Sequence, residues 1–277
     1  MSRNIVQRTR GHAGGPLTRL VSPPDLRQLL NPFVFLDLFD FRVGHAPPLE
    51  FGWHLHSGIA IVTVVFDGAV QFAEATGRAG MLPAGGVEWM QAGGGVWHTG
   101  TVGADHVKGF QLWVALPPPL ENVPTASHYL LPEQVPGSGP VRAVLGAYGG
   151  LESPLPAPSM TYLALTLRDG ERWTFTPPAG HGVAWAAVLD GALEAPAPIG
   201  PREVAVFERS EGPIAFASSG ETRFVLGSAP LHPHELVLGS YSVHTSTAAL
   251  ALGETEIRRT GPQFRAEGRQ SYALGFG

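Results

Sequence analysis

The 277-residue chain contains no cysteine, which excludes disulfide bonds, thiolate metal sites and a cysteine nucleophile. Charged residues are also scarce, at 15 %, and the 23 acidic residues outnumber the 18 basic ones. This balance gives no support to direct nucleic-acid binding, which needs a basic surface. The apolar stretch 32–39 is far shorter than the ~20 residues that span a bilayer, and the first residues lack the apolar core of a secretory signal. We therefore expect a cytoplasmic protein without a membrane segment.

Glycine and proline are abundant instead, with 36 and 26 residues, and this composition favours short strands joined by tight turns. Residues 59–66 are continuously apolar and rich in β-branched side chains, which predicts a buried strand. The Asp67-Gly68 step that follows predicts a hairpin into a second strand over 69–74. Further strands are predicted over 87–90, 96–98, 109–116, 160–167, 173–176, 183–189, 204–207, 214–217 and 224–226. So many short strands indicate an all-β sandwich or barrel.

A weak internal repeat indicates two copies of one β-unit. The segment 65–70 (Val-Phe-Asp-Gly-Ala-Val) is similar to 188–193 (Val-Leu-Asp-Gly-Ala-Leu). The proline-rich span 151–159 is stiff enough to form the junction between the copies. Residues 246–257 predict the best helix of the chain, with a Ser or Thr cap near Ser246.

Three histidines give the strongest chemical signal. His54 and His56 flank Leu55, and His98 follows 42 residues after His56. On a strand, side chains at i and i+2 share a face with Cα atoms roughly 6.6 Å apart, so two imidazoles can converge on one ion. A third histidine from a neighbouring strand would complete a site with open positions for water, oxygen or substrate. The alternative is that these are ordinary strand histidines, packed or hydrogen-bonded at a barrel mouth.

The chain resembles the pirin family of bicupins across roughly residues 5–265. The resemblance is densest in the first half, where a Trp-Met-x-Ala-Gly-x-Gly segment precedes His98. The segments that carry it are 31–33, 54–58, 82–98, 109–117 and 230–231. It implies two tandem cupin (jelly-roll) barrels with a short C-terminal helix. The expected domains are an N-terminal cupin with the metal site (1–150), a metal-free C-terminal cupin (151–245), and a segment that packs back on the first domain (246–277).

The resemblance also implies the ligand set. Pirins typically bind iron or another divalent metal through an HxH pair, a later histidine and a glutamate two residues beyond it. The histidines correspond to His54, His56 and His98, but the glutamate position is Gly100, and the usual Arg-Gly-Phe-Glu after HxH is replaced by 57–60 (Ser-Gly-Ile-Ala). Without the carboxylate, less of the charge of the metal ion is balanced, so the affinity of the site for metal should fall. The site should then prefer Zn, Ni or Cu over iron, or it should bind no metal. Glu88 is a candidate substitute carboxylate, although a strand glutamate usually faces solvent or is ion-paired.

Two functions follow from the resemblance. In the first, the chain is a quercetin 2,3-dioxygenase-type oxidoreductase with altered or reduced activity on a small aromatic or flavonol-like substrate. In the second, it is a non-catalytic regulatory protein that binds a protein partner, and its metal site is degenerate or empty. The sequence assigns no catalytic residue and leaves open whether the chain is an enzyme.

Overall fold

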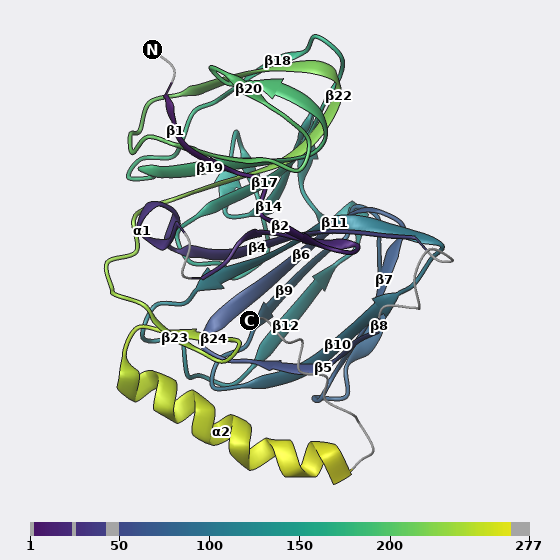
Figure 1. Cartoon of the computed structure of the whole chain (residues 1–277), viewed down its shortest axis with the longest axis vertical. Helices are drawn as coiled ribbons and strands as arrows, with labels where there is room; N and C mark the ends of the chain where they lie inside the picture. The colour runs from purple at the N-terminus through teal and green to yellow at the C-terminus, as the bar shows by residue number, and fades with distance from the viewer. Residues whose placement is uncertain (1–2, 24–25, 43–49, 267–277) are drawn as a thin grey trace. The chain divides into compact units, whose positions relative to one another are not determined.

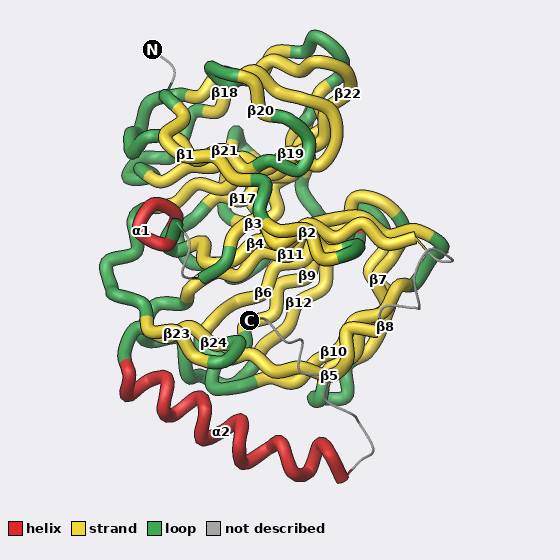
Figure 2. The backbone as a smooth tube through the Cα atoms, in the orientation of Figure 1, coloured by secondary structure: helices red, strands yellow, loops and turns green. Residues whose placement is uncertain are grey.

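A computed structural model describes residues 3–23, 26–42 and 50–266, and strands dominate these residues (Figure 2). The predicted all-β class is confirmed. The chain forms two compact units, each built from two stretches: Met1–Leu38 with Glu133–Pro233 (unit 1), and Phe39–Pro132 with His234–Gly277 (unit 2). The contiguous domains expected over 1–150, 151–245 and 246–277 stay a prediction. Neither α-helix of the described residues combines the length and apolar character that a membrane crossing requires.

Unit 2 contains the three histidines and two sheets. One sheet has the order β5-β10-β7-β8, and these strands lie side by side in Figure 1. The other includes the run β12-β9-β6-β11, with β4 next to β11. The bounds are β4 Phe33–Arg42, β5 Glu50–His56, β6 Ile59–Asp67, β7 Ala69–Glu74, β8 Ala79–Pro83, β9 Val87–Gln91, β10 Val96–Val102, β11 His106–Ala115 and β12 Ala126–Leu130. β6 is almost wholly buried, as its β-branched run predicts.

The C-terminal part of unit 2 is a small hairpin followed by one long helix (Figure 1). The hairpin consists of β23 (Val237–Gly239) and β24 (Ser242–His244), and both strands contact α2 (Thr247–Ala266). The predicted cap is confirmed, because Ser246 Oγ accepts a hydrogen bond from the Ala249 amide at 3.1 Å. The helix is longer than the predicted 246–257.

Unit 1 is built around a nine-stranded sheet. Its main order is β1-β21-β19-β22-β17-β14-β13, with β18 paired to β22 and β20 to β19. The bounds are β1 Ile5–Thr9, β13 Gly137–Ser138, β14 Val141–Leu145, β17 Thr161–Leu167, β18 Arg172–Phe175, β19 Val183–Glu194, β20 Pro198–Ile199, β21 Val204–Phe207 and β22 Ile214–Ala229. The smaller elements of the chain are β2 (His12–Gly14), β3 (Leu17–Val21), α1 (Arg27–Leu30), the 3₁₀ turn Pro132–Gln134, β15 (Ala147–Tyr148) and β16 (Leu151–Glu152). An apolar cluster that includes Phe175, Phe207, Phe216 and Phe224 fills the core of this unit.

Two local predictions are wrong. The Asp67-Gly68 step is not a hairpin: β6 pairs with β9 and β11, whereas β7 pairs with β8 and β10, so the chain changes sheets at this step. Gly68 has φ +70°, and a Cβ there would lie 1.7 Å from the His106 carbonyl oxygen, so only glycine fits. The strands predicted over 214–217 and 224–226 are one strand, β22, because Gly220 (φ +73°) lies within the strand without ending it.

Candidate metal centre

The three histidines lie on two paired strands. β5 and β10 run antiparallel, with His98 opposite His54 and Val96 opposite His56, so alternate residues bring all three rings to one face. The ring centroids are 4.3 Å apart for His54 and His98, 5.1 Å for His56 and His98, and 5.0 Å for His54 and His56. One nitrogen from each ring lies within 4.8 Å of the other two. Nitrogens on a single ion are about 3 Å apart, so small ring movements would complete the approach.

Backbone carbonyl groups orient two of these rings. The Nδ1 atom of His54 lies 2.8 Å from the Gly52 oxygen, and that of His56 lies 3.1 Å from the Tyr241 oxygen. A carbonyl oxygen only accepts, so both Nδ1 atoms carry the proton and both Nε2 atoms keep a lone pair. This arrangement is typical of metal-binding histidines, whose other nitrogen donates to a carbonyl or carboxylate.

Two nitrogen atoms of this cluster are without a partner in the part of the chain that the structure describes. Nε2 of His56 and Nε2 of His98 are both buried and have no hydrogen-bond partner among the described residues. An unsatisfied buried polar group costs about 1–3 kcal/mol, so natural proteins rarely keep two such atoms side by side without a ligand. Two orphaned nitrogens that share a face with a third imidazole are a donor set that fits a divalent metal.

Burial also sets the protonation state of the site. Desolvation lowers the pKa of His54, and it lowers the pKa of His56 and His98 well below the usual value. The neighbouring imidazoles reinforce the shift for His56 and His98. All three rings are therefore neutral at neutral pH, which is the form that binds metals.

Position 100 contributes no ligand. Gly100 lies on β10 opposite Phe72 of β7, and the pairing of β10 with β5 is irregular between His98 and Gly100. A glycine has no side chain that could bind a metal, so His98 is the ligand that this part of β10 can supply.

Buried carboxylates nevertheless occur in the same unit. Glu74 lies directly opposite His98 in the pairing of β7 with β10, and directly opposed residues share a face of the sheet. Tyr129 Oη donates to Glu74 Oε1 at 2.7 Å and also lies 3.1 Å from Glu88 Oε1, and Thr63 Oγ1 donates to Glu88 Oε2 at 2.6 Å. Glu88 is buried, whereas a strand glutamate usually faces solvent. It does not belong to the group of side chains that surrounds the histidine nitrogens.

The Glu74–Tyr129–Glu88 contacts require a shared proton. Tyr129 has one hydroxyl proton but contacts two carboxylates, so the second contact is favourable only when Glu88 is protonated and donates to the tyrosine oxygen. Burial raises the pKa of Glu88 to about 7, although its hydrogen bonds with Thr63 and Tyr129 act in the opposite direction, and the charge of Glu74 adds to the rise. The unit thus holds a titratable proton near neutral pH.

Aromatic side chains lie on both faces of the histidine-bearing sheet. The Trp113 ring is 4.7 Å from the His56 ring and forms part of the wall beside the cluster. Trp97, next to His98 in the sequence, is expected to point away from the cluster. This is confirmed, because Trp97 Nε1 donates to Thr260 Oγ1 of α2 at 3.3 Å.

One group of buried polar residues was missed by sequence reasoning, which treated His244 as an isolated histidine. Its Nε2 lies 3.0 Å from Ser57 Oγ, and its Nδ1 lies 3.4 Å from Glu121 Oε2. Ser57 follows the metal-site strand directly, whereas His244 is 187 residues further along the chain. The only sequence signal for this contact is the alternation of Ser242, Val243 and His244, which is too short to be decisive.

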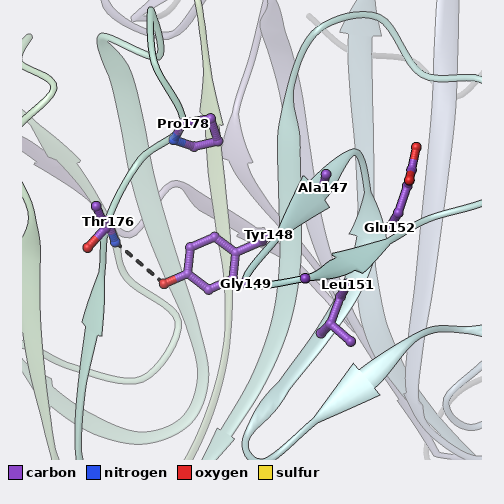
Figure 3. A pocket seen from close by; sticks show the side chains of 8 residues that line it. Ala147, Tyr148, Gly149, Leu151, Glu152, Thr176 and Pro178 are labelled. Carbon is purple, nitrogen blue, oxygen red and sulfur yellow. Dashed lines mark hydrogen bonds between the residues drawn. The ribbon is translucent and has the colours of Figure 1, made fainter.

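The other features weighed from the sequence lie elsewhere. His181 is buried in unit 1, and the prediction that the second barrel holds no metal stays a prediction. The His232-Pro233-His234 motif lies outside the strands, as expected for a loop. Unit 1 also has an open hollow lined by Tyr148, Glu152, Thr176 and Pro178, in which the Thr176 amide donates to Tyr148 Oη (Figure 3). It contains no cluster of metal-ligating side chains among the described residues.

Comparisons with known proteins agree with the fold and the motif. The family model described as Pirin matches residues 15–114. A Pseudomonas aeruginosa protein named "Putative quercetin 2,3-dioxygenase" is 30 % identical over 270 residues, which cover 88 % of this chain and 92 % of that protein. A crystal structure of quercetin 2,3-dioxygenase from Acinetobacter baumannii superposes with a TM-score of 0.85 at 21 % identity, over 94 % of this chain and 98 % of that one. The Escherichia coli pirin YhhW in complex with nickel(II) superposes with a TM-score of 0.65 at 18 % identity, over 82 % of this chain and 99 % of that one.

The fold expectation is therefore confirmed: the chain consists of two cupin barrels, and its similarity to the solved structures extends over nearly the whole length. The sequence similarity to the Pseudomonas protein is equally extensive, and the matched family segment contains all three clustered histidines. Together these findings assign the chain to the pirin family.

Proposed function

We propose that the protein is a pirin-type metalloprotein of the quercetin 2,3-dioxygenase kind, with one divalent metal held by His54, His56 and His98 and with altered or reduced activity. The observation that carries the proposal is the pair of buried, unpartnered Nε2 atoms on His56 and His98, close to a nitrogen of His54. The substrate class is a small aromatic, flavonol-like molecule, in line with the names of the relatives.

The residues of this chain define what the site can do. The metal would supply Lewis-acid and redox chemistry. His54 and His56 present preset lone pairs because their Nδ1 protons are engaged by carbonyl oxygens. Position 100 has no carboxylate to act as a general base for a phenolic substrate, although the same unit holds a titratable proton in the Glu74–Tyr129–Glu88 array. This loss is the reason for proposing reduced or altered activity.

The identity of the metal follows from the donor set and from the family. The pirin resemblance favours iron, whereas three neutral imidazoles without a carboxylate suit Zn, Ni or Cu as well. The nickel(II) complex of the E. coli pirin supports nickel as one of these candidates. Loading the metal-free protein separately with each ion, and measuring retention during dialysis, ranks these candidates.

Elemental analysis of the purified protein tests the metal site. The wild type should contain close to one metal per chain, and His56→Ala should lose it. His128→Ala is the matched control, because His128 is an exposed histidine of the same unit outside the cluster. Metal content that is far below one per chain and equal in all three proteins would rule out the metalloprotein proposal.

A second experiment returns the missing carboxylate. Gly100→Glu should raise iron retention, because residues 98 and 100 of one strand share a face and the added group balances part of the charge of the ion. Oxygen consumption with quercetin should rise in the same variant. If iron retention is unchanged both in Gly100→Glu and in Gly100→Glu combined with Phe72→Ala, which removes the ring opposite position 100, this stretch of β10 does not follow the family geometry.

The absence of a side chain at position 100 also favours a second function. A pirin whose centre lacks a ligand and a base fits a non-catalytic regulatory protein that binds a protein partner in the cytoplasm. The two functions differ in a direct assay: metal-loaded protein that consumes no oxygen with quercetin or related flavonols, even as Gly100→Glu, supports the regulatory role.

A further inference from the structure

A short C-terminal segment, Tyr241–Thr245, lies against the end of the metal-site strand. Ser57 and Ser242 form a parallel backbone bridge, and the Val243 amide donates to the Ser57 carbonyl oxygen at 3.3 Å. Their side chains also meet, because Ser57 Oγ donates to Ser242 Oγ at 2.9 Å across 185 residues of sequence. The segment thus forms backbone and side-chain contacts to the residue that follows His56.

The same segment reaches His56 itself. The Tyr241 carbonyl oxygen accepts the hydrogen bond from His56 Nδ1 at 3.1 Å. Tyr241 has φ +56°, in the left-handed region that a bulky residue seldom adopts. Such strain persists only where the surroundings impose it, and it clusters at functional sites. Here it coincides with the carbonyl that fixes the tautomer of a candidate ligand.

His244 holds this segment against the end of the metal-site strand. Its Nε2 hydrogen-bonds to Ser57 Oγ at 3.0 Å, and its Nδ1 lies 3.4 Å from Glu121 Oε2 without forming a hydrogen bond; all three side chains are buried. Glu121 in turn accepts from the Thr245 amide at 2.7 Å and from Thr245 Oγ1 at 2.8 Å. The imidazole therefore ties the end of β5 to β24, and Thr245 ties the loop after β11 to the same segment.

The Ser57–His244–Glu121 arrangement has the residue types of a hydrolytic triad, but the space around it argues against hydrolysis. Gly253 of α2 packs on the two reactive atoms: a Cβ at this position would lie 2.7 Å from Ser57 Oγ and 2.8 Å from His244 Nε2. The hydroxyl thus has no room for an acyl substrate. A buried polar bridge that cannot meet substrate acts through what it positions, and here its neighbour is His56.

We propose that His244 is a positioning residue of the metal centre: through its hydrogen bond to Ser57 it holds Tyr241–His244, named here the C-terminal clamp, so that the Tyr241 carbonyl fixes His56 with its Nε2 lone pair toward the other histidines. The proposal rests on the metal site proposed above, because fixing a tautomer matters only where the free nitrogen binds an ion. Groups that orient metal-binding histidines typically change metal affinity by roughly 10–100-fold when they are removed.

The first test needs no metal. In metal-free protein labelled with ¹⁵N-histidine, two-bond ¹H–¹⁵N spectra report the tautomer of each ring. In the wild type, His56 should be a single Nδ1–H tautomer. In His244→Ala, its signals should move toward a mixture of tautomers. His54 is the internal control, because its Nδ1 partner is the Gly52 carbonyl of its own strand.

The second test measures metal release. Chelator competition on zinc-loaded protein should show release at least 10-fold faster in His244→Ala than in the wild type. Thr260→Val is the matched control, since it removes the α2 contact to Trp97 but no part of the C-terminal clamp, and its release should stay within about twofold of the wild type. Ser57→Ala, which removes one hydroxyl, gives the same comparison if His244→Ala does not fold.

The outcomes separate this proposal from the metal site on which it rests. If the wild type binds no zinc, the metal site is contradicted. If His56 is nevertheless a single tautomer that depends on His244, the positioning contact is still supported. A folded His244→Ala or Ser57→Ala variant with an unchanged His56 tautomer and an unchanged release rate overturns the positioning role. Equal changes at His54 and His56 also overturn it, because they would report a general loosening of the barrel.

Discussion

Glu88 gives the sharpest prediction about stability, because it is a buried carboxyl with a pKa of about 7, raised from 4.5 chiefly by burial. Thr63 and Tyr129 hydrogen-bond to it, and Glu74 is the charged group that faces it. Below about pH 4.5 the carboxyl is protonated in both the folded and the unfolded chain, so its contribution to stability is fully present. As the pH rises toward 7, the unfolded chain ionises freely and the folded chain does not, so this stability is lost.

The size of this loss of stability follows from the shift in the pKa of Glu88. A difference of about 2.5 pKa units at about 1.36 kcal/mol per unit is roughly 3 kcal/mol, most of it lost between about pH 5 and pH 8. Glu88→Gln cannot ionise, yet its amide can still accept from Thr63 and donate to the tyrosine oxygen. It should be more stable than the wild type at pH 8 by about 2–3 kcal/mol and differ little at pH 5.

Urea denaturation followed by tryptophan fluorescence, at pH 5 and at pH 8, measures both differences. The control is Glu133→Gln, which changes an exposed glutamate and should leave the pH dependence as it is in the wild type. If the free energies of unfolding of the wild type and Glu88→Gln change in parallel between the two pH values, Glu88 does not hold the shared proton and the reasoning fails.

Three further changes test other parts of the structure. Burial keeps the pKa of His98 well below its usual range, so the protein should retain its metal as the pH falls through 6.5 and lose it only at lower pH. Metal content after equilibration in buffers of decreasing pH measures this, and a loss of metal centred above pH 6.5 would contradict it. Gly58→Ala should destabilise the protein by several kcal/mol in thermal denaturation, because φ is +74° and a Cβ would lie 2.1 Å from the Val243 carbonyl oxygen; a near-neutral result would mean that β24 does not pack there. Gly227→Ala should cost about 1–3 kcal/mol, since a Cβ would meet the Trp185 ring at 2.5 Å, and unfolding at the wild-type temperature would show that this ring can move aside.

The strands that the sequence predicts best are bounded by turn residues and are either continuously apolar, as in β21, or alternate between apolar and polar residues, as in β7. β7 and β21 have the predicted bounds, and β6 and β9 differ from them by one residue at the C-terminal end. In these segments local preference and burial agree, so the pattern is sufficient. The Asp67-Gly68 step shows where it is not: the dipeptide favours a reversal of the chain, but the partners of β6 and β7 lie in different sheets, which only the tertiary structure decides.

The histidine site could be found because its geometry is partly local. A strand with period two places His54 and His56 on one face, and the antiparallel partner brings His98 to the same place. The carbonyl partners of the rings could not be found in this way. Gly52 is close in sequence, but Tyr241 and His244 come from almost 200 residues away, and no periodicity or spacing records a contact that the fold makes over such a distance.

The missing ligand at position 100 is better understood together with its neighbours than alone. Gly100 lies opposite Phe72, and the Phe72 ring stacks on Tyr129 with centroids 3.7 Å apart and planes 6° from parallel. A glycine opposite an aromatic residue leaves room for the ring, which here supports the tyrosine that joins Glu74 to Glu88. In this barrel Glu74 and Glu88 are thus hydrogen-bonded around a tyrosine, where they hold a proton, and among the described residues no carboxylate lies with the histidine nitrogens. A carboxylate added at position 100 would share its face with Phe72, so full recovery of an iron site should require a smaller side chain at position 72 as well.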